Sequence, residues 1–310
     1  MGIAPTTAPR NYGARQSMGV PMINRVRIKN YRAILSVDVE LDRFNVLTGP
    51  NASGKTTFLD AITFARDVIA LDLPGACFGG ARSRCTHPTE LTWQQYGGRI
   101  EIEIEFSNRL MPDNKFWCDK LKYSLHVSTT PELDVITDAV SLDYEAPRSL
   151  VAAAASNVRG FLSEHTLVYA PSPSAMRRPA AAYWDILPDA SNLPWIVYRL
   201  EQEAPERMVA WRNHVCTALQ DVVKITTKAR EEDGARYIEL THSSGLALPA
   251  WLLSDGTLRF LALTILPYMK LPPSIIIIEN IEQNLHPHMI EPLLQSLTSI
   301  YDSQVLCTSY

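Results

Sequence analysis

Gly49-Pro50-Asn51-Ala52-Ser53-Gly54-Lys55-Thr56 matches the phosphate-loop pattern at every defining position, and Thr57 follows it. A short apolar run, residues 44–47, precedes this stretch, and apolar side chains recur after it at helical spacing: Phe58, Ile62, Ala65 and Ile69. Backbone N–H groups of such a loop surround an anion, and the start of the next helix adds partial positive charge. The pattern predicts a nucleoside triphosphate site, in which Lys55 reaches the β- and γ-phosphates and Thr56 binds Mg²⁺.

A second group of motifs lies near the carboxyl end of the chain. Leu253-Ser254-Asp255-Gly256-Thr257 precedes a predicted helix, and Glu279 directly follows the run Ile275–Ile278. Consecutive isoleucines predict a buried parallel strand, which would bring the Glu279 carboxylate to a sheet edge. That acid could bind the Mg²⁺ held by Thr56, usually through water. Taken alone, an apolar run that ends in glutamate is more often an ordinary core strand.

Alternating apolar and polar residues predict antiparallel strands with one exposed face in the first part of the chain. The alternating segments are residues 26–28, 35–41, 100–106 and 121–127. Residues 71–96 are less regular and indicate a surface segment. Further on, we expect strands at 167–170, 237–240, 275–278 and 304–307, and helices at 152–155, 192–223, 258–269 and 285–300. The predicted fold class is α/β, with an antiparallel β lobe and a helical insertion.

From Ile23 onward the chain resembles the ABC-class ATPases of the SMC, RecF and OLD type, and in particular their smaller relatives among bacterial AAA family ATPases. The resemblance rests on Ile28–Arg32, residues 49–57, Asp189–Leu193, Leu253–Thr257 and Ile275–Pro287. It implies a P-loop NTPase fold, the ABC-type ATPase head. In that family two subunits sandwich two ATP molecules, each between the phosphate loop of one subunit and the signature motif of the other.

The same resemblance assigns roles to the second group of motifs. Ser254, Asp255 and Gly256 belong to the signature, and Ser254 and Gly256 would contact the γ-phosphate of the ATP bound to the partner's Lys55. Glu279 would be the Walker B acid that binds Mg²⁺. Residues 283–286 would form the D-loop that signals across the dimer.

The chain departs from this family in three places. The family normally has a second acid after the Walker B acid, which orients and deprotonates the attacking water, and Asn280 stands there. An amide can hydrogen-bond a water molecule but cannot accept its proton. Tyr310 stands where the family has its switch histidine, and residues 171–174, near the expected Q-loop, contain no glutamine. We therefore predict ATP binding with slow hydrolysis, since general-base assistance typically contributes ~10²–10⁴ in rate.

The predicted organisation is a disordered tail over residues 1–21 and a single ATPase head over 22–310. Within the head we expect an N-terminal lobe with the phosphate loop (22–130), a mostly helical insertion (131–235) and a lobe with the signature and Walker B motifs (236–310). Relatives continue beyond the position of Tyr310. We therefore expect the chain to be a fragment or a truncated copy.

Composition limits the location and the partners. The net charge of −4 argues against a globally basic nucleic-acid binder, although a local basic groove stays open. Five cysteines with no CxxC pair argue against a disulfide framework or a zinc site and favour the cytoplasm. No apolar run approaches the ~20 residues of a membrane span.

The resemblance implies an ATP-dependent homodimer in DNA repair or anti-phage defence, with a nuclease or another effector as partner and DNA as a further candidate. The alternative is a catalytically degenerate, nucleotide-bound scaffold that holds a partner effector. A phosphate-loop kinase would leave the signature motif without a role.

Three smaller features allow two interpretations each. The pair Arg177–Arg178, in a proline-rich loop, and Arg82 with Arg84 either contact nucleic-acid phosphates or belong to solvated loops. The pair Tyr31–Arg32 either lies near the adenine or serves packing. His286 and His288 either bind a metal or belong to a structural turn, and the Leu-His-Pro of the resembled family favours the turn.

Overall fold

The computed structural model describes residues 21–79, 83–107, 121–143, 146–272 and 274–310. The chain divides into two compact units. Unit 1 comprises residues 1–167, 272–277 and 302–310, and unit 2 comprises residues 168–271 and 278–301. The predicted disordered tail, apart from its last residue, lies outside the described residues. The predicted division of the head at residues 130 and 235 stays a prediction.

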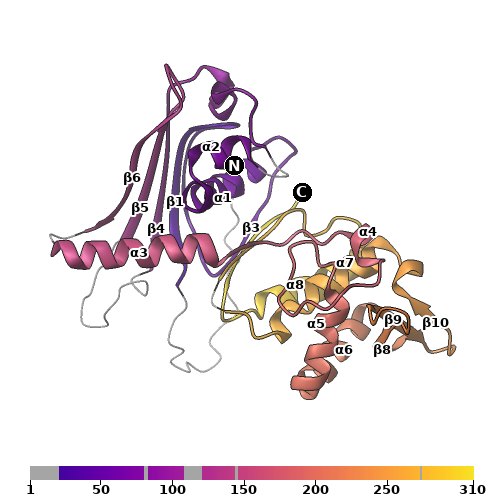
Figure 1. Cartoon of the computed structure of the whole chain (residues 1–310). Coiled ribbons are helices and arrows are strands. Elements are labelled where there is room, and N and C mark those ends of the chain that lie inside the picture. Colours follow the sequence, from indigo (N-terminus) through magenta and orange to yellow (C-terminus); the bar gives the residue numbers. More distant parts are fainter. Residues whose placement is uncertain (1–20, 80–82, 108–120, 144–145, 273) are drawn as a thin grey trace. The chain divides into compact units, whose positions relative to one another are not determined.

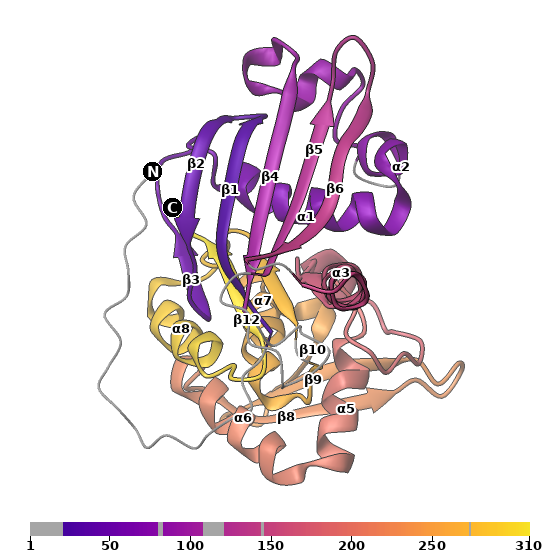
Figure 2. The same ribbon diagram turned by 90° about the vertical axis from the view of Figure 1, so that its left-hand side faces the viewer.

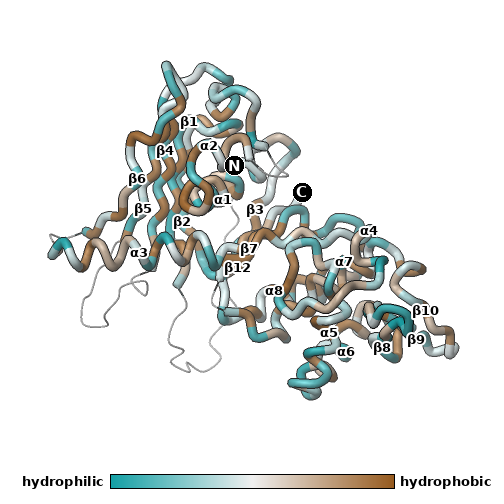
Figure 3. The backbone as a smooth tube through the Cα atoms, viewed as in Figure 1, coloured by the Kyte–Doolittle hydropathy of each residue, from teal (hydrophilic) through white to brown (hydrophobic). Residues whose placement is uncertain are grey.

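Unit 1 contains an antiparallel five-stranded sheet in the order β2-β1-β4-β5-β6. Its strands are β1 (Ile23–Tyr31), β2 (Ile34–Glu40), β4 (Arg99–Phe106), β5 (Leu121–Ser128) and β6 (Asp134–Leu142). Hydrophilic and hydrophobic residues alternate along these strands (Figure 3), so that Ile28, Ile102 and Leu125 are fully buried. The opposite face carries ion pairs, for example Arg27 with Glu105 and Lys29 with Glu101. The predicted antiparallel lobe with one exposed face is confirmed.

Helix α1 (Lys55–Leu71) packs on this sheet against β1 and β4 (Figures 1 and 2). Helix α2 (Leu73–Phe78) packs on α1, and α3 (Arg148–Glu164) packs on α1 and on the edge strand β6. Phe58, Ile62 and Ala65 of α1 are fully buried, as their helical spacing predicts. Short 3₁₀ helices follow at Pro88–Leu91 and Trp93–Gln95.

A second sheet of four strands positions the phosphate loop. Its order is β3-β12-β11-β7, from β3 (Phe44–Leu47), β12 (Gln304–Thr308), β11 (Ile275–Ile278) and β7 (Thr166–Val168). Strands β3 and β12 are parallel, so their carboxyl ends lie at the same sheet edge. Burial of all four isoleucines of β11 confirms the predicted core strand.

Unit 2 packs helices around Trp211, which is fully buried and donates a hydrogen bond through Nε1 to Thr264 Oγ1 at 3.1 Å. Its helices are α4 (Pro173–Met176), α5 (Leu193–Glu203), α6 (Pro205–Ala218), α7 (Asp255–Thr264) and α8 (Ile290–Thr298). A three-stranded antiparallel sheet in the order β10-β9-β8 completes the unit, from β8 (Val222–Ala229), β9 (Arg236–His242) and β10 (Ala247–Pro249). Short 3₁₀ helices lie at Ala250–Leu252, Leu266–Tyr268 and Pro287–Met289.

Several predicted boundaries were wrong. Segment 71–96 is not a surface segment throughout, because α2 lies in it and Cys77, Cys85 and Leu91 are buried. The segment predicted to be mostly helical contains helices α3–α6 but also β6, β7 and β8. Helix α3 is much longer than the predicted 152–155.

Candidate functional site

The phosphate loop begins where β3 ends and closes onto the first turn of α1. Its backbone adopts positive φ at Gly49 (150°), Ala52 (62°) and Gly54 (94°), and Gly54 is the N-cap of α1. A left-handed conformation is easily reached by glycine and is costly for most other residues, which explains the glycine that precedes Lys55. The first turn of α1 contains no acidic residue, so no side-chain charge there opposes an anion at the helix start.

The loop has the chemistry that a polyphosphate needs. Lys55 is only 7% exposed, and its Nζ donates hydrogen bonds to the carbonyl oxygens of Gly49 and, at 3.0 Å, Pro50. Ser53 Oγ is buried and has no hydrogen-bond partner. A Cβ added at Gly49 would stand 3.0 Å from that Oγ. A buried hydroxyl without a partner and a cationic side chain that donates to nearby carbonyls fit a site built for an anion.

Tyr310 lies beside this loop. The backbone N–H of Ser309 donates to the Leu47 carbonyl at 3.0 Å, which extends the pairing of β12 with β3 to the loop entrance. As a result, Lys55 Nζ is 5.8 Å from the centroid of the Tyr310 ring. The structure thus brings the predicted switch position together with the phosphate-loop lysine within unit 1.

The signature residues form the start of α7 in unit 2. Ser254 is the N-cap, and its Oγ accepts a hydrogen bond from the Thr257 N–H at 3.1 Å. Gly256 touches the segment that the resemblance assigns to the D-loop, since a Cβ added there would stand 2.3 Å from the Asn284 carbonyl oxygen. Any side chain at 256 would therefore push the helix away from residue 284.

Glu279 and Asn280 follow β11 in a turn, and Arg259 of α7 holds that turn. Arg259 Nη2 donates to the carbonyl oxygens of Glu279 and Asn280, each at 2.9 Å. The Arg259 side chain is buried, and this burial lowers the pKa of its guanidinium. Asn280 has φ of 50°, a left-handed conformation that asparagine tolerates better than most residues.

Sequence reasoning missed Arg259, although a signal was present. The arginine interrupts an otherwise apolar run, Leu258 and residues 260–263, in a part of the helix where every residue is buried. A charged residue in such a helix needs polar partners. It finds them in the backbone of the turn that carries Glu279 and Asn280.

The Asp60 carboxylate on α1 is the centre of a charged cluster that sequence reasoning also missed. It accepts hydrogen bonds from the Tyr31 hydroxyl at 2.8 Å, from Arg32 at 2.7 Å and from Arg84 at 3.0 Å. Burial raises the pKa of Asp60, but Arg84, Tyr31 and Arg32 together outweigh burial and leave that pKa below its ordinary value. The burial of Tyr31 and the pairing of Arg32 with Asp60 favour the packing interpretation of Tyr31–Arg32.

The other two weaker signals also have structural partners. Arg177 contacts the signature, with Nη2 bonded to Asp255 Oδ1 at 2.5 Å and to the Leu253 carbonyl at 2.9 Å. The rings of His286 and His288 contact each other, and His288 Nε2 lies 2.9 Å from the Ala218 carbonyl. Among the described residues no group of three or more His, Cys, Asp and Glu could hold a metal.

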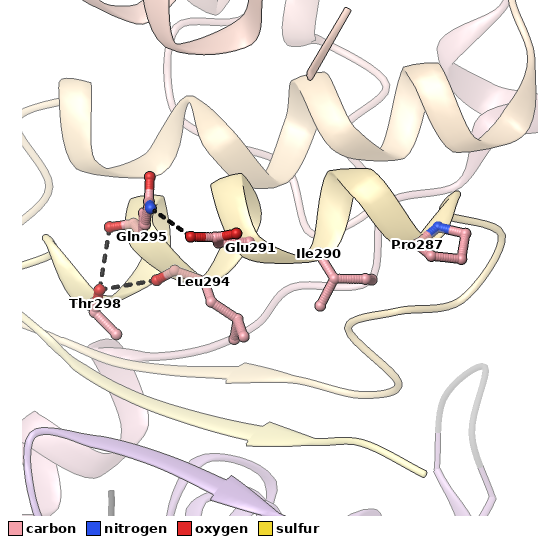
Figure 4. A pocket seen from close by; sticks show the side chains of 6 residues that line it. All are labelled: Pro287, Ile290, Glu291, Leu294, Gln295 and Thr298. Atoms are coloured by element: carbon pink, nitrogen blue, oxygen red, sulfur yellow. Dashed lines mark hydrogen bonds between the residues drawn. The ribbon is translucent and has the colours of Figure 1, made fainter. Parts of the chain in front are cut away.

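A hollow along α8 contains none of the predicted site residues (Figure 4). Its polar groups bond within the helix: Gln295 Nε2 to Glu291 at 3.3 Å, and Thr298 Oγ1 to the Leu294 carbonyl at 2.8 Å. It therefore offers few free polar groups to a ligand.

The predicted site residues form two sets, with the phosphate loop and Tyr310 in unit 1 and the signature, Glu279 and Asn280 in unit 2.

The fold and these motifs define the class of protein: an SMC/RecF-like, ABC-type AAA ATPase. The family described as "AAA domain, putative AbiEii toxin, Type IV TA system" matches residues 137–309, and the AAA ATPase domain matches residues 22–136. The first match spans more than half of the chain, so the chain belongs to this family of AAA domains. Membership implies nucleotide binding, typically with Mg²⁺.

Solved structures with the same fold are Smc head domains. The head with an extended coiled coil bound to the C-terminal domain of ScpA, from Pyrococcus furiosus, has a TM-score of 0.57 at 13% identity and covers 93% of this chain and 89% of that one. The SmcHead bound to the C-winged helix domain of ScpA gives 0.58 at 14%, with the same coverage. The head with a coiled coil and joint from Pyrococcus yayanosii gives 0.53 at 11%, covering 93% and 92%.

One curated relative matches locally. The DNA double-strand break repair Rad50 ATPase of Methanopyrus kandleri is 53% identical over 45 residues, which is 14% of this chain. The match spans only 5% of the length of that relative. Within the described residues, no helix has both the length and the apolar character to cross a membrane.

Proposed function

We propose that the chain is an ATP-binding subunit of the SMC/RecF/OLD type, which dimerises on Mg-ATP and hydrolyses it slowly. The observation that carries this proposal is the phosphate loop, which combines a buried Lys55, a buried Ser53 hydroxyl without a hydrogen-bond partner and a helix start without acidic residues. Backbone N–H groups of residues 49–54 would hold the phosphates. Lys55 would exchange its carbonyl partners for the β- and γ-phosphates.

Thr56 and Glu279 would hold Mg²⁺, which when bound neutralises phosphate charge. Ser254 and Gly256 would contact the γ-phosphate of ATP in a second copy. Asn280 would hydrogen-bond the attacking water without accepting its proton, and Tyr310 could donate to the γ-phosphate. Each role rests on the resemblance to the ATPase head.

The biological setting is DNA repair or anti-phage defence. The family description names a toxin and a Type IV TA system, and the local relative is a DNA-repair ATPase; both support such a setting. A nuclease or another effector would be the partner, with DNA as a second ligand. We place the protein in the cytoplasm, because five cysteines without a CxxC pair argue against a disulfide framework.

Asn280 favours a second function, the nucleotide-bound scaffold that holds a partner effector. ATP turnover separates the two functions. Hydrolysis that DNA stimulates supports the first function, whereas a permanently bound, unhydrolysed nucleotide supports the second.

Replacing Lys55 tests the proposal directly. Lys55→Ala should weaken Mg-ATP affinity tenfold or more, because a charge-assisted contact to phosphate is lost. Isothermal calorimetry with ATP measures this, and circular dichroism checks the fold. Lys29→Ala, on the exposed sheet face, is a matched control that should bind like the wild type. Equal affinity of folded Lys55→Ala and wild type would refute the phosphate-loop assignment.

A further inference from the structure

The signature motif carries an acid where a phosphate is expected to arrive. Asp255 is the first residue of α7 and follows the N-cap Ser254. An acid in the first turn stabilises a helix, because it complements the partial positive charge of the N-terminus. The same carboxylate opposes a triphosphate that approaches this terminus, because like charges repel strongly near a protein surface. A signature that binds phosphate therefore needs this charge to be compensated.

Arg177 provides the compensation. Its Nη2 donates to Asp255 Oδ1 at 2.5 Å and to the Leu253 carbonyl at 2.9 Å, so it bonds to the residues on both sides of Ser254. A turn of backbone fixes the arginine, since the Arg177 N–H donates to the Pro173 carbonyl at 3.1 Å at the end of α4. Both side chains stay partly exposed, 32% for Arg177 and 49% for Asp255, so the pair is reachable from solution.

We propose that Arg177 is a positioning residue for the signature: it neutralises Asp255 and so allows Ser254 and Gly256 to receive the triphosphate bound to a second copy of this chain. The inference rests on the proposed ATP-dependent dimer. It replaces both earlier interpretations of Arg177, a nucleic-acid contact and a solvated loop. It also gives a role to the proline-rich segment in which the expected Q-loop glutamine is missing.

The test is a double-mutant cycle on the full chain. The dimerisation constant in saturating Mg-ATP is measured by sedimentation velocity, and ATP affinity is measured separately on the same variants. Arg177→Gln should weaken dimerisation about tenfold or more, since it leaves Asp255 uncompensated at the arriving phosphate. Adding Asp255→Asn should restore dimerisation, because the repelling charge is gone. Arg178→Gln, an equal change at the exposed neighbour, should behave like the wild type.

Two outcomes count against the inference, and a third variant decides if Arg177→Gln is unfolded. If Arg177→Gln dimerises as Arg178→Gln does, the charge at 177 has no role. If the double variant stays as weak as Arg177→Gln, the arginine acts only through the Leu253 carbonyl and is merely structural. If Arg177→Gln does not fold, Asp255→Asn alone decides: dimerisation at or above the wild-type level supports the inference, and its loss overturns it.

Failure of the proposed ATP-dependent dimer can be distinguished from failure of the Arg177 inference. A wild type that binds ATP and stays monomeric refutes the dimer itself, and the inference with it, before any variant is compared.

Discussion

The backbone conformation at position 280 limits which residues this position tolerates. The left-handed backbone of Asn280 (φ 50°) lies in the turn after β11, where Arg259 holds its carbonyl. A carboxylate at this position has to be accommodated in that turn. Most residues other than asparagine, aspartate and glycine lose about 1–2 kcal/mol in a left-handed conformation. The left-handed backbone of this turn therefore accommodates asparagine at the position where the family has an acid.

Restoring an acid should nevertheless accelerate hydrolysis. Asn280→Glu should raise the steady-state ATPase rate about tenfold or more, a fraction of the general-base range, since Tyr310 and the Q-loop still depart from the family. Asn280→Gln has the same length without the charge and should stay at the wild-type rate. Asn280→Asp tolerates the left-handed turn and shows whether backbone strain limits the glutamate. Brisk wild-type hydrolysis that none of these variants changes would mean that another residue activates the water.

The candidate site could be predicted from sequence only where function depends on contiguous residues. Residues 49–56 are contiguous and form the loop and the start of α1, so their spacing is enough to predict the phosphate loop around Lys55. The partners Arg177–Asp255 and Arg259–Asn280 are far apart in sequence and meet only when unit 2 folds. No local pattern encodes such pairs, although a charged residue in a buried helix indicates that a partner exists.

At the scale of elements, periodicity predicted the strands with a clear apolar pattern, the edge strand β2 among them, and missed β6 and β8. Strands β1, β4 and β5 are buried on one face along their length, so their alternation is regular. Strand β6 is an edge strand with Ile136 half exposed, and β8 is mixed with polar residues, so both patterns are weak. Two helices end or begin at other residues than predicted, and a proline lies near each of these ends. Pro267 follows the end of α7, and Pro287 precedes the start of α8.

The anchoring of α1 gives a stability prediction. Asp60 fixes this helix to the β1–β2 turn and to Arg84, whose side chain is only 10% exposed. Asp60→Asn should destabilise the protein by about 2 kcal/mol at pH 7, because Arg32 and the buried Arg84 lose a charged partner, while Arg84 keeps its ion pair with Asp67 at 2.7 Å. Urea unfolding measures the change. Glu40→Gln removes an exposed ion pair with Arg25 and should cost well under 1 kcal/mol.

The same carboxylate predicts a pH dependence. The folded-state pKa of Asp60 lies below its ordinary value of 3.8, so its contribution is fully present above that value and is lost as the pH falls through the folded-state pKa. Wild type should therefore lose stability below about pH 4 more steeply than Asp60→Asn. Parallel acid slopes for the two proteins would show that Asp60 is not the carboxylate that the arginines stabilise.

At the scale of the whole molecule, each described unit carries half of an ATP site of the proposed kind. Unit 1 contains the phosphate loop and unit 2 the signature. In the proposed dimer, the phosphate loop of one copy and the signature of the second copy bind the same ATP molecule. ATP itself therefore becomes part of the interface. Two copies should then associate only when both the loop and the signature are intact.

Ser254→Arg tests this assembly. The N-cap hydroxyl of α7 is small, and an arginine there adds bulk and charge at the surface that would meet the partner's phosphate. In saturating Mg-ATP we expect sedimentation velocity to give a dimer for the wild type and a monomer for Ser254→Arg. ATP affinity should stay near wild type, because Lys55 and the loop are untouched. Ser254→Thr keeps the capping oxygen and should still dimerise, whereas a dimer formed equally by Ser254→Arg would place the interface elsewhere.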